Sequence, residues 1–127
     1  MMRAVLDTSV LLAPGLGALP GELAISVATM AELHFGVLVA KKEPVRAARL
    51  RRLSRLQRHF DPLPIDDAVA ASYGELAAAV ARAGRQPRAR VMDLLIAATA
   101  HAHDARVYTC NAKDFAGVHD LVEIVAV

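Results

Sequence analysis

Four acidic residues of this 127-residue sequence stand beside its most apolar stretches. Asp7 interrupts the apolar run RAVLDTSVLL near the amino end. Burying an ionised carboxylate without a partner costs at least several kcal/mol, so a helix terminus, a basic side chain or a metal ion must compensate it. The other three carboxylates lie in ATMAELHFG, MDLLIAATA and TCNAKDF, and the full set is Asp7, Glu32, Asp93 and Asp114.

Each of these carboxylates also has a purely structural interpretation. Asp7 can cap the helix that follows it. Thr29-x-x-Glu32 has the pattern of a capping box, in which Glu32 bonds back to the Thr29 amide. Asp93 can be a first-turn acid that the helix dipole favours, and Asp114 can form an Asx turn. Single positions therefore do not distinguish a cap from a ligand.

Taken together, the four carboxylates favour a metal site. Like charges a few ångströms apart raise each other's pKa unless a cation intervenes. Oxygen ligands without cysteine or closely spaced histidine are typical of Mg²⁺ or Mn²⁺. The sequence therefore predicts that Asp7 is tolerated among apolar residues because it holds a metal ion.

Other catalytic chemistries find little support. His101 and His103 are two residues apart on an expected helix, so they point to different faces and cannot chelate together. Cys110 has no evident base partner and is interpreted as a packed thiol. The glycines of APGLGALPG (13–21) do not match a dinucleotide fingerprint, and this segment is expected to be a loop. The sequence contains no Ser-His-Asp arrangement and no phosphate-binding P-loop motif.

Composition bounds the class of protein. With 55% hydrophobic but only 4% aromatic residues, aliphatic side chains must build the core of a single expected domain over residues 1–127. No apolar stretch approaches the roughly 20 residues that cross a bilayer, and Asp7 interrupts the only candidate signal segment. The single cysteine excludes an internal disulfide and fits a reducing cytosol. We therefore expect a cytoplasmic protein without a membrane partner.

Basic residues are unevenly distributed despite a net charge of only +2. From Lys41 to Arg58 the sequence carries eight basic residues and one acidic residue, Glu43. Four more arginines follow at Arg82, Arg85, Arg88 and Arg90. Such a stripe indicates a polyanionic partner, because phosphate contacts supply most sequence-independent affinity for nucleic acids. A solvated helix face is the alternative.

Strands and helices are expected to alternate along the chain. Leu53, Leu56 and Phe60 recur at spacings of three and four, which is typical of a helix. Asp66 and Gly84 are expected at the cap and at the end of another helix. The predicted strands are 3–6, 22–27, 106–110 and 121–127. The predicted helices are a turn from Thr8, then 30–40, 44–59, 66–84 and 92–103, with an extended piece at 60–65 near a sheet edge.

This alternation predicts an α/β protein with a parallel sheet covered on both faces. Ligand sites in such sheets lie at the carboxyl ends of the strands. Asp7 directly follows the first expected strand and therefore belongs at the mouth of the cleft.

Four motifs in fixed order resemble one known family. LDTSV, TMAELHFGVL, MDLLIAATA and TCNAKDF follow one another as in the PIN-domain family, specifically its VapC-type toxin ribonucleases. DLLIAATA followed by T-x-N-x-x-D-F is the most diagnostic part, and the resemblance spans nearly the whole chain.

The resemblance implies a three-layer α/β/α domain around a central, mainly parallel sheet. It also implies an endoribonuclease that depends on Mg²⁺, with Mn²⁺ able to substitute, and that hydrolyses RNA phosphodiester bonds. The implied partners are a second copy of the chain, forming a homodimer, and a cognate VapB-type antitoxin whose tail lies across the active site and neutralises the toxin.

By position, the resemblance assigns roles to individual residues. The catalytic acidic cluster matches Asp7, Glu32, Asp93 and Asp114, and the principal metal ligands among them match Asp7 and Asp93. The supporting polar positions match Thr8, Ser9 and Asn111. Cys110 stands where many members carry Arg, and Asp104 stands where Gly or another turn-former is usual, which leaves substrate contacts near that strand open.

The same residues are compatible with two other functions. A phosphatase with an aspartyl-phosphate intermediate wants a second acid two residues after its nucleophile, and that position is Ser9. A non-catalytic RNA- or protein-binding module on the same fold, with the carboxylates as caps, is the main alternative. Metal-dependent cleavage distinguishes it from the enzyme, since a cap has no need of Mg²⁺.

Overall fold

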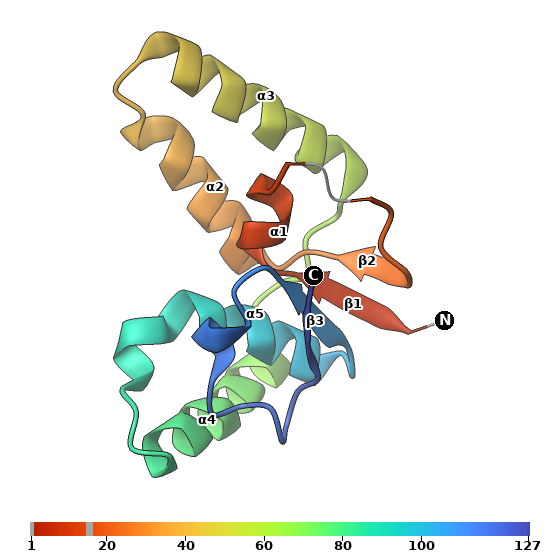
Figure 1. Ribbon diagram of the computed structural model, residues 1–127, viewed down its shortest axis with the longest axis vertical. Coiled ribbons are helices and arrows are strands. Elements are labelled where there is room, and N and C mark those ends of the chain that lie inside the picture. Colours follow the sequence, from red (N-terminus) through yellow and green to blue (C-terminus); the bar gives the residue numbers. More distant parts are fainter. Residues whose placement is uncertain (1, 15–16) are drawn as a thin grey trace.

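The computed structural model describes residues 2–14 and 17–127 (Figure 1). Four strands run through the chain: β1 (Arg3–Leu6), β2 (Glu22–Ala24), β3 (Arg106–Thr109) and β4 (Ile124–Ala126). The α-helices are α1 (Thr8–Leu12), α2 (Val27–Val39), α3 (Glu43–His59), α4 (Asp67–Arg82) and α5 (Val91–Ala102). Two short 3₁₀ helices are η1 (Pro87–Arg90) and η2 (Ala112–Phe115).

The four strands form one sheet in the order β2-β1-β3-β4, and every neighbouring pair is parallel. Residue Val5 of β1 lies between Ala24 of β2 and Val107 of β3. From β1 the chain crosses to β2 on one side, while β3 and β4 extend the sheet on the other. The strand order therefore reverses between β1 and β3, and a ligand cleft is expected outside their carboxyl ends.

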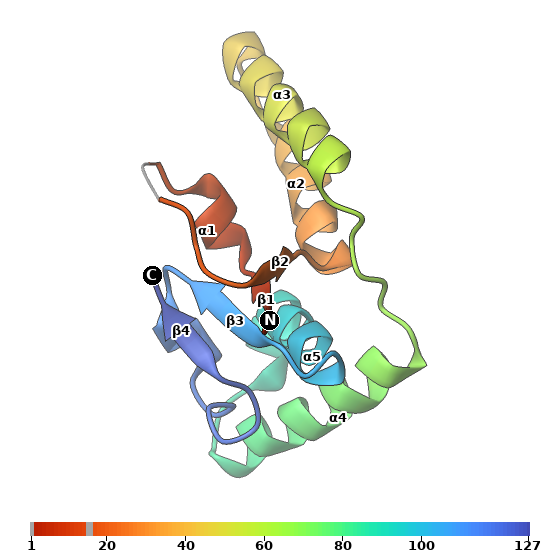
Figure 2. The same cartoon turned by 90° about the vertical axis from the view of Figure 1, so that its right-hand side faces the viewer.

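Helices cover both faces of the sheet, as Figure 2 shows with α1, α2 and α3 on one side and α4 and α5 on the other. Alternate residues of β1 follow this division because successive side chains of a strand point to opposite faces. Val5 packs with Ile96 and Leu76 in the core on the α4–α5 side. Ala4 and Leu6 pack in the core on the opposite side. The predicted three-layer α/β/α architecture is confirmed.

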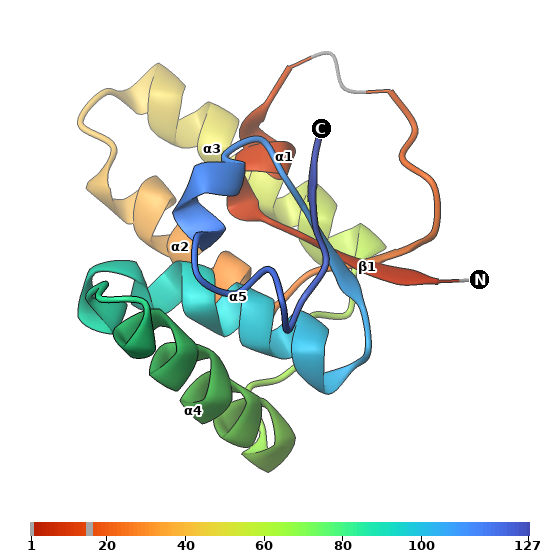
Figure 3. The same ribbon diagram turned by 60° about the horizontal axis from the view of Figure 1, so that its bottom comes forward.

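Helix α5 lies against the sheet and α4 covers it from outside (Figure 3). Helix α5 is apolar on nearly all sides, which explains why every one of residues 96–100 is buried. The cap of α4 is the predicted one, since the Asp66 side chain accepts from the Val69 amide at 3.0 Å. Gly84 follows the end of α4 with a positive φ of 79°, as the sequence led us to expect.

The carboxyl end of α5 explains one departure from the family pattern. Asp104 has a φ of 51°, and the Ala105 amide donates to the Ala100 carbonyl at 2.8 Å. This pairing closes a Schellman motif, whose left-handed residue is usually glycine. Asp104 tolerates the conformation because its short polar side chain is one of the few that visit it.

Strand β2 is shorter and α2 begins earlier than the sequence predicted. The strand ends at Ala24, and Ser26 caps α2 by accepting from the Ala28 amide at 3.0 Å. Ser26 also bridges Leu63 in parallel fashion at the sheet edge, which confirms the extended segment expected at 60–65. The predicted strand 22–27 and helix start at 30 were wrong because Ser26, rather than Thr29, supplies the cap.

Two arginines of the basic stripe fasten α3 to α2. Arg46 donates to the Ala40 carbonyl at 2.6 Å and pairs with Glu43 at 2.9 Å. Arg49 donates to the Gly36 carbonyl, also at 2.6 Å. The stripe from 41 to 58 is therefore partly a structural device and not one continuous surface for a polyanion.

Two remaining sequence expectations concern the loop and the membrane. The glycine-rich segment 13–21 forms neither helix nor strand wherever it is described, and residues 15–16 of that expectation lie outside the described residues. Within the described chain, we find no helix with the length and apolar character needed to traverse a bilayer.

Candidate active site

Asp7 is held at the point where β1 ends beside β3. Its amide donates to the Tyr108 carbonyl at 2.9 Å, which continues the pairing of the two strands. Its carboxylate is buried and Oδ2 accepts from the hydroxyls of Ser9 at 2.7 Å and Thr109 at 2.8 Å. Asp7 occupies the N-cap position of α1, yet its side chain caps no amide of that helix. The capping interpretation of Asp7 was therefore wrong.

A small network of hydroxyls fixes this carboxylate. The Cys110 amide donates to Ser9 Oγ at 3.0 Å, and the Asn111 amide donates to Thr109 Oγ1 at 2.9 Å. Both hydroxyl oxygens thus accept hydrogen bonds from backbone amides of the β3–η2 turn, and each hydroxyl donates its proton to Asp7 Oδ2. In the described contacts, the hydroxyls occupy only Oδ2, so Oδ1 is left for another ligand.

Glu32 reaches the same cleft from the second turn of α2. Thr8 Oγ1 donates to Glu32 Oε1 at 2.7 Å and lies 3.2 Å from Thr29 Oγ1. Because α2 starts at Val27, Thr29 is an interior helical residue and is fully buried. The predicted Thr29–Glu32 capping box is therefore wrong, and Glu32 is oriented by a different helix.

Asp93 and Asp114 complete the cluster, and both form ion pairs with the Arg90 guanidinium. Asp93 lies in the first turn of α5, and Asp114 lies in η2 after β3. Arg90 Nη1 is 3.3 Å from Asp114 Oδ1 and 3.8 Å from Asp93 Oδ2. The two carboxylates are about three-quarters buried, whereas 52% of the Arg90 side chain is exposed.

The pKa of Asp93 shows that the four carboxylates act on one another. Burial raises it first, and the charges of Asp7 and Asp114 raise it further. Arg90 opposes the rise, and Glu32 adds to it, so that the pKa moves from 3.8 to about 6. The cluster is therefore a region of concentrated negative charge into which a cation is strongly drawn.

The donor chemistry fits a hard divalent cation. The cluster offers only carboxylate oxygens, and the raised pKa of Asp93 records a repulsion that such a cation relieves. Over residues 2–14 and 17–127, no three Asp, Glu, His or Cys side chains already stand in a metal-binding geometry. Two of the carboxylates, Asp93 and Asp114, are paired with Arg90.

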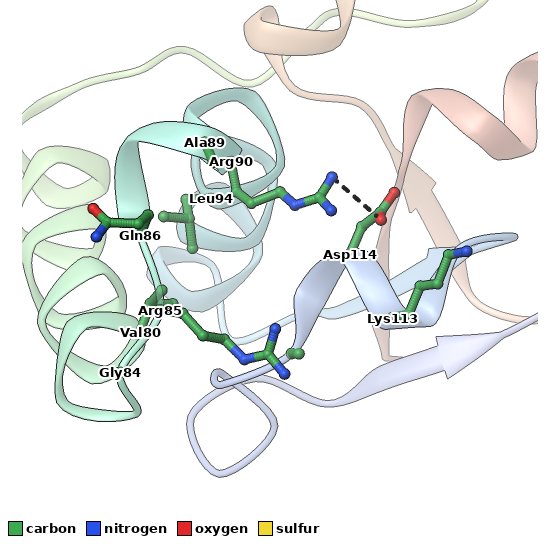
Figure 4. Close-up of a pocket in the computed structure, with 10 residues that line it drawn as sticks. Val80, Gly84, Arg85, Gln86, Ala89, Arg90, Leu94, Lys113 and Asp114 are labelled. Atoms are coloured by element: carbon green, nitrogen blue, oxygen red, sulfur yellow. Dashed lines mark ion pairs between the residues drawn. The ribbon is translucent and has the colours of Figure 1, made fainter.

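Two hollows flank the cluster. One of about 300 Å³ lies beside Asp114, between the α4–α5 connection and η2 (Figure 4). The other, of about 670 Å³, lies between α1, α2 and α3 and includes Thr8 and Glu32. It is lined mainly by aliphatic side chains, with Arg49 and Arg52 at one side.

The structure brings the four predicted carboxylates into one cleft, together with Thr8 and Ser9. Asn111 contributes its backbone, since its side chain caps nothing in η2 and lies exposed. Sequence reasoning missed Thr109 and the ion pairs of Arg90, and the interpretation of Cys110 as a packed thiol was wrong, because Cys110 is exposed. The role of Thr109 could have been predicted from the sequence, because it is a polar residue at the end of the apolar strand RVYT and therefore faces the expected cleft.

Comparison with known proteins finds relatives that match almost the whole chain. The PIN domain family model matches residues 4–120. Ribonuclease VapC5 of Mycobacterium tuberculosis is 38% identical over 97% of this chain and 94% of that protein. The crystal structure of VapBC-5, a member of the VapBC family of toxin-antitoxin systems from the same organism, superposes with a TM-score of 0.88 at 38% identity over the full length of both chains. FitAcB of Neisseria gonorrhoeae superposes with a TM-score of 0.78 at 26% identity over 95% of each chain. A match over almost the entire sequence, with the acidic cluster at the expected strand ends, shows that this chain belongs to the PIN domain family.

Proposed function

We propose that this chain is an endoribonuclease toxin that hydrolyses RNA phosphodiester bonds and depends on Mg²⁺, with Mn²⁺ able to replace it. The observation that supports it most strongly is the convergence of Asp7, Glu32, Asp93 and Asp114 at the carboxyl ends of β1 and β3. Similarity to proteins named ribonuclease VapC5 and VapC8 supports the activity.

Asp7 and Asp93 are the proposed principal metal ligands, with Glu32 and Asp114 as further members of the catalytic set. Asp7 presents Oδ1 because Ser9 and Thr109 engage Oδ2. A divalent ion held by these carboxylates would lower the pKa of a bound water and would neutralise charge that builds up on the phosphate. Its presence also removes the penalty of bringing a polyanion to an acidic cleft.

Glu32 is the proposed residue that orients the attacking water. The Thr8 hydroxyl fixes Oε1 of Glu32, so Oε2 is the atom left to accept a hydrogen bond from water in a constant direction. Thr8 is thus a positioning residue. Preorganisation of this kind matters because a base must lie within hydrogen-bond reach of the proton it takes.

The substrate must be recognised with few aromatic side chains, since only 4% of residues are aromatic. Stacking on unpaired bases is therefore a minor contribution. We propose that the RNA backbone and its shape are recognised, with exposed basic side chains beside the cleft as the contacts.

A cognate VapB-type antitoxin is the proposed regulatory partner. The similar VapBC-5 structure from Mycobacterium tuberculosis is a member of the VapBC family of toxin-antitoxin systems. The 670 Å³ hollow beside Glu32 offers Leu12, Leu33 and Val45 next to Arg49, which suits a peptide with apolar and acidic side chains. A peptide there covers Glu32 and blocks RNA.

Three further expectations stay predictions. One is a homodimer, as the family resemblance implies. Another is a single domain over residues 1–127. The third is a cytoplasmic location, which the RNA substrate and the single cysteine favour.

The decisive experiment incubates antitoxin-free protein with total cellular RNA in Mg²⁺ or Mn²⁺, and in excess EDTA. Asp93→Asn is run in parallel, with Asp61→Asn as the matched control, because Asp61 is exposed and lies outside the cluster. We expect discrete fragments from the wild type and Asp61→Asn, and none with EDTA or Asp93→Asn. Cleavage that persists in Asp93→Asn removes that residue from the mechanism. RNA binding without metal-dependent cleavage in several RNA pools favours the non-catalytic module.

A further inference from the structure

Arg90 is the one basic residue that the described structure pairs with the acidic cluster. It ends η1 and directly precedes α5, so it lies one turn before Asp93. Its Nη1 atom faces Asp114 Oδ1 at 3.3 Å and Asp93 Oδ2 at 3.8 Å. In Figure 4 the Arg90 side chain extends across the hollow toward Asp114, with the ion pair marked.

This pairing is loose. A single nitrogen serves both carboxylates, and none of the hydrogen bonds found over the described residues involves the Arg90 side chain. Half of the side chain is in contact with solvent, and exposed ion pairs contribute little to stability. A guanidinium carries several N–H donors, so most of them remain available to another acceptor. Arg90 can therefore change partners at little cost.

The hollow beside Asp114 has the chemistry of a phosphate site. Arg85, Gln86, Arg90 and Lys113 are among the residues that line its volume of about 300 Å³. Figure 4 shows Arg85 and Arg90 reaching into it from the α4–α5 connection, opposite η2. Guanidinium groups bind phosphate oxygens in a bidentate manner and are preferred for that purpose. Asp114 is the only acidic residue among the lining side chains.

We propose that this hollow binds a backbone phosphate of the RNA and that Arg90 exchanges between two partners. Without a divalent cation, Arg90 serves as the counter-ion of Asp93 and Asp114. Once a divalent cation balances the carboxylates, Arg90 is released to the phosphate, which Arg85 also contacts. This inference rests on the proposed function and assigns Arg90 as a substrate-binding residue within it.

The exchange predicts opposite effects of one substitution on two affinities. Arg90→Gln removes a positive charge that competes with the metal ion, so Mn²⁺ should bind roughly tenfold more tightly, a size expected for charges a few ångströms apart at the surface. The same variant should bind RNA less tightly, because the guanidinium that holds the phosphate is gone. A residue that merely stabilises the start of α5 would not strengthen metal binding.

The first measurement is calorimetric titration of the full chain with Mn²⁺ at pH 8. The wild type is compared with Arg90→Gln and with Arg88→Gln, a matched control on the same 3₁₀ helix that is exposed and does not line the hollow. Arg85→Gln is included as a variant that should change RNA affinity only. We expect tighter Mn²⁺ binding in Arg90→Gln alone.

The second measurement is the fluorescence anisotropy of a labelled single-stranded oligoribonucleotide of mixed sequence, in Mn²⁺ and at several salt concentrations. Each substitution is placed in a Glu32→Gln background to prevent cleavage, and a gel checks that the RNA stays intact. Arg90→Gln and Arg85→Gln should each weaken binding and reduce the slope of log affinity against log salt by about 0.7 for the phosphate interaction removed. Arg88→Gln should do neither.

The outcomes separate this inference from the nuclease itself. Equal Mn²⁺ affinity, or equal RNA affinity, in Arg90→Gln and Arg88→Gln overturns the exchange even when the wild type cleaves RNA normally. The expected pair of opposite shifts in a chain that cleaves no RNA supports the exchange and refutes the nuclease. A wild-type chain that binds neither probe overturns both.

Discussion

Asp93 is expected to weaken the fold that contains it. Its pKa is about 6 in the folded chain against 3.8 for an ordinary aspartate, so the folded state favours the protonated form. The difference of about 2 units corresponds to ~3 kcal/mol, since each unit is worth about 1.4 kcal/mol. At neutral pH the carboxylate is ionised, and that free energy is a penalty on folding.

Asp93→Asn should therefore make the metal-free protein more stable at pH 8. The figure of ~3 kcal/mol is an upper bound, because solvent reaches about a quarter of the Asp93 side chain and screens its interactions, and because the variant also loses a favourable interaction with the α5 dipole, worth about 0.3–1 kcal/mol. We expect a gain of about 1–3 kcal/mol. For a chain of this length that corresponds to a rise in Tm of about 3–9 °C.

The pH dependence gives the sign an independent check. Below pH 3.8 the Asp93 carboxyl is protonated in both states, so the penalty vanishes. It grows as the pH rises from 3.8 to about 6 and is complete above that range. The advantage of the variant should thus shrink to about 0.5 kcal/mol at pH 4, as the same linkage relation gives.

The assay is urea unfolding of both proteins in EDTA at pH 4, 6 and 8, with Asp61→Asn as the control. Surface substitutions such as the control usually change stability by less than about 0.5 kcal/mol. Equal stabilities of Asp93→Asn and wild type at pH 8 would refute the reasoning. So would a gain that does not change with pH, because that gain would come from helix propensity or packing instead of charge.

Three further substitutions test other parts of the structure. Thr109→Val keeps the shape but removes the donor to Asp7 Oδ2, so urea unfolding should show a loss of about 1–3 kcal/mol and RNA cleavage should slow; an unchanged rate would mean that Asp7 needs no such support. Asp104→Gly relieves the left-handed backbone at φ 51° and should stabilise the fold by about 0.5–1 kcal/mol without affecting cleavage, whereas a loss of stability would show that the Asp104 side chain has an important partner. Leu76→Ala empties a fully buried position of α4 in the core on the α4–α5 side of the sheet and should cost about 2–5 kcal/mol in thermal or urea unfolding; a cost below about 1 kcal/mol would show that this core closes readily around a cavity.

Positions that depend on one element were predictable from the sequence. Asp7 follows an apolar strand, and that alone puts it at the cleft of a parallel sheet. Asp66 and Gly84 delimit α4 through local capping chemistry. The near-continuous apolar run of α5 determined both its burial and the place of Asp93 on its first turn.

Positions that depend on two distant elements were not predictable in the same way. Ser26 and Thr29 are both good caps, and the choice between them is made by the bridge from Ser26 to Leu63. That choice decides whether Glu32 bonds to its own helix or to Thr8. The charge on Arg46 likewise gave no sign that it would bind a backbone carbonyl of the α2–α3 turn.

The same was true of Arg90, whose partner Asp114 lies 24 residues further on. Spacing in the sequence connects Arg90 with Asp93 as an i, i+3 pair. The second ion pair, between Arg90 and Asp114, forms only because the fold places η2 beside the start of α5. A cluster of charged residues in a sequence thus gives the total charge of a region, but it does not tell which acidic side chain each basic side chain pairs with.

The hydrogen bond from Thr109 to Asp7 has a consequence for the timing of synthesis. It joins residues 102 positions apart, and β1 has no neighbour on its β3 side until Arg106–Thr109 has been made. Ribosomes build chains from the amino end, and long-range parallel pairing is slow to form. The half of the chain that is synthesised first therefore contains Asp7 and Glu32. It lacks β3, whose Thr109 orients the Asp7 carboxylate, and it lacks α5, which carries Asp93. The acidic cluster can therefore assemble only after α5 and β3 have been made, so the last step of its formation depends on residues that are synthesised late.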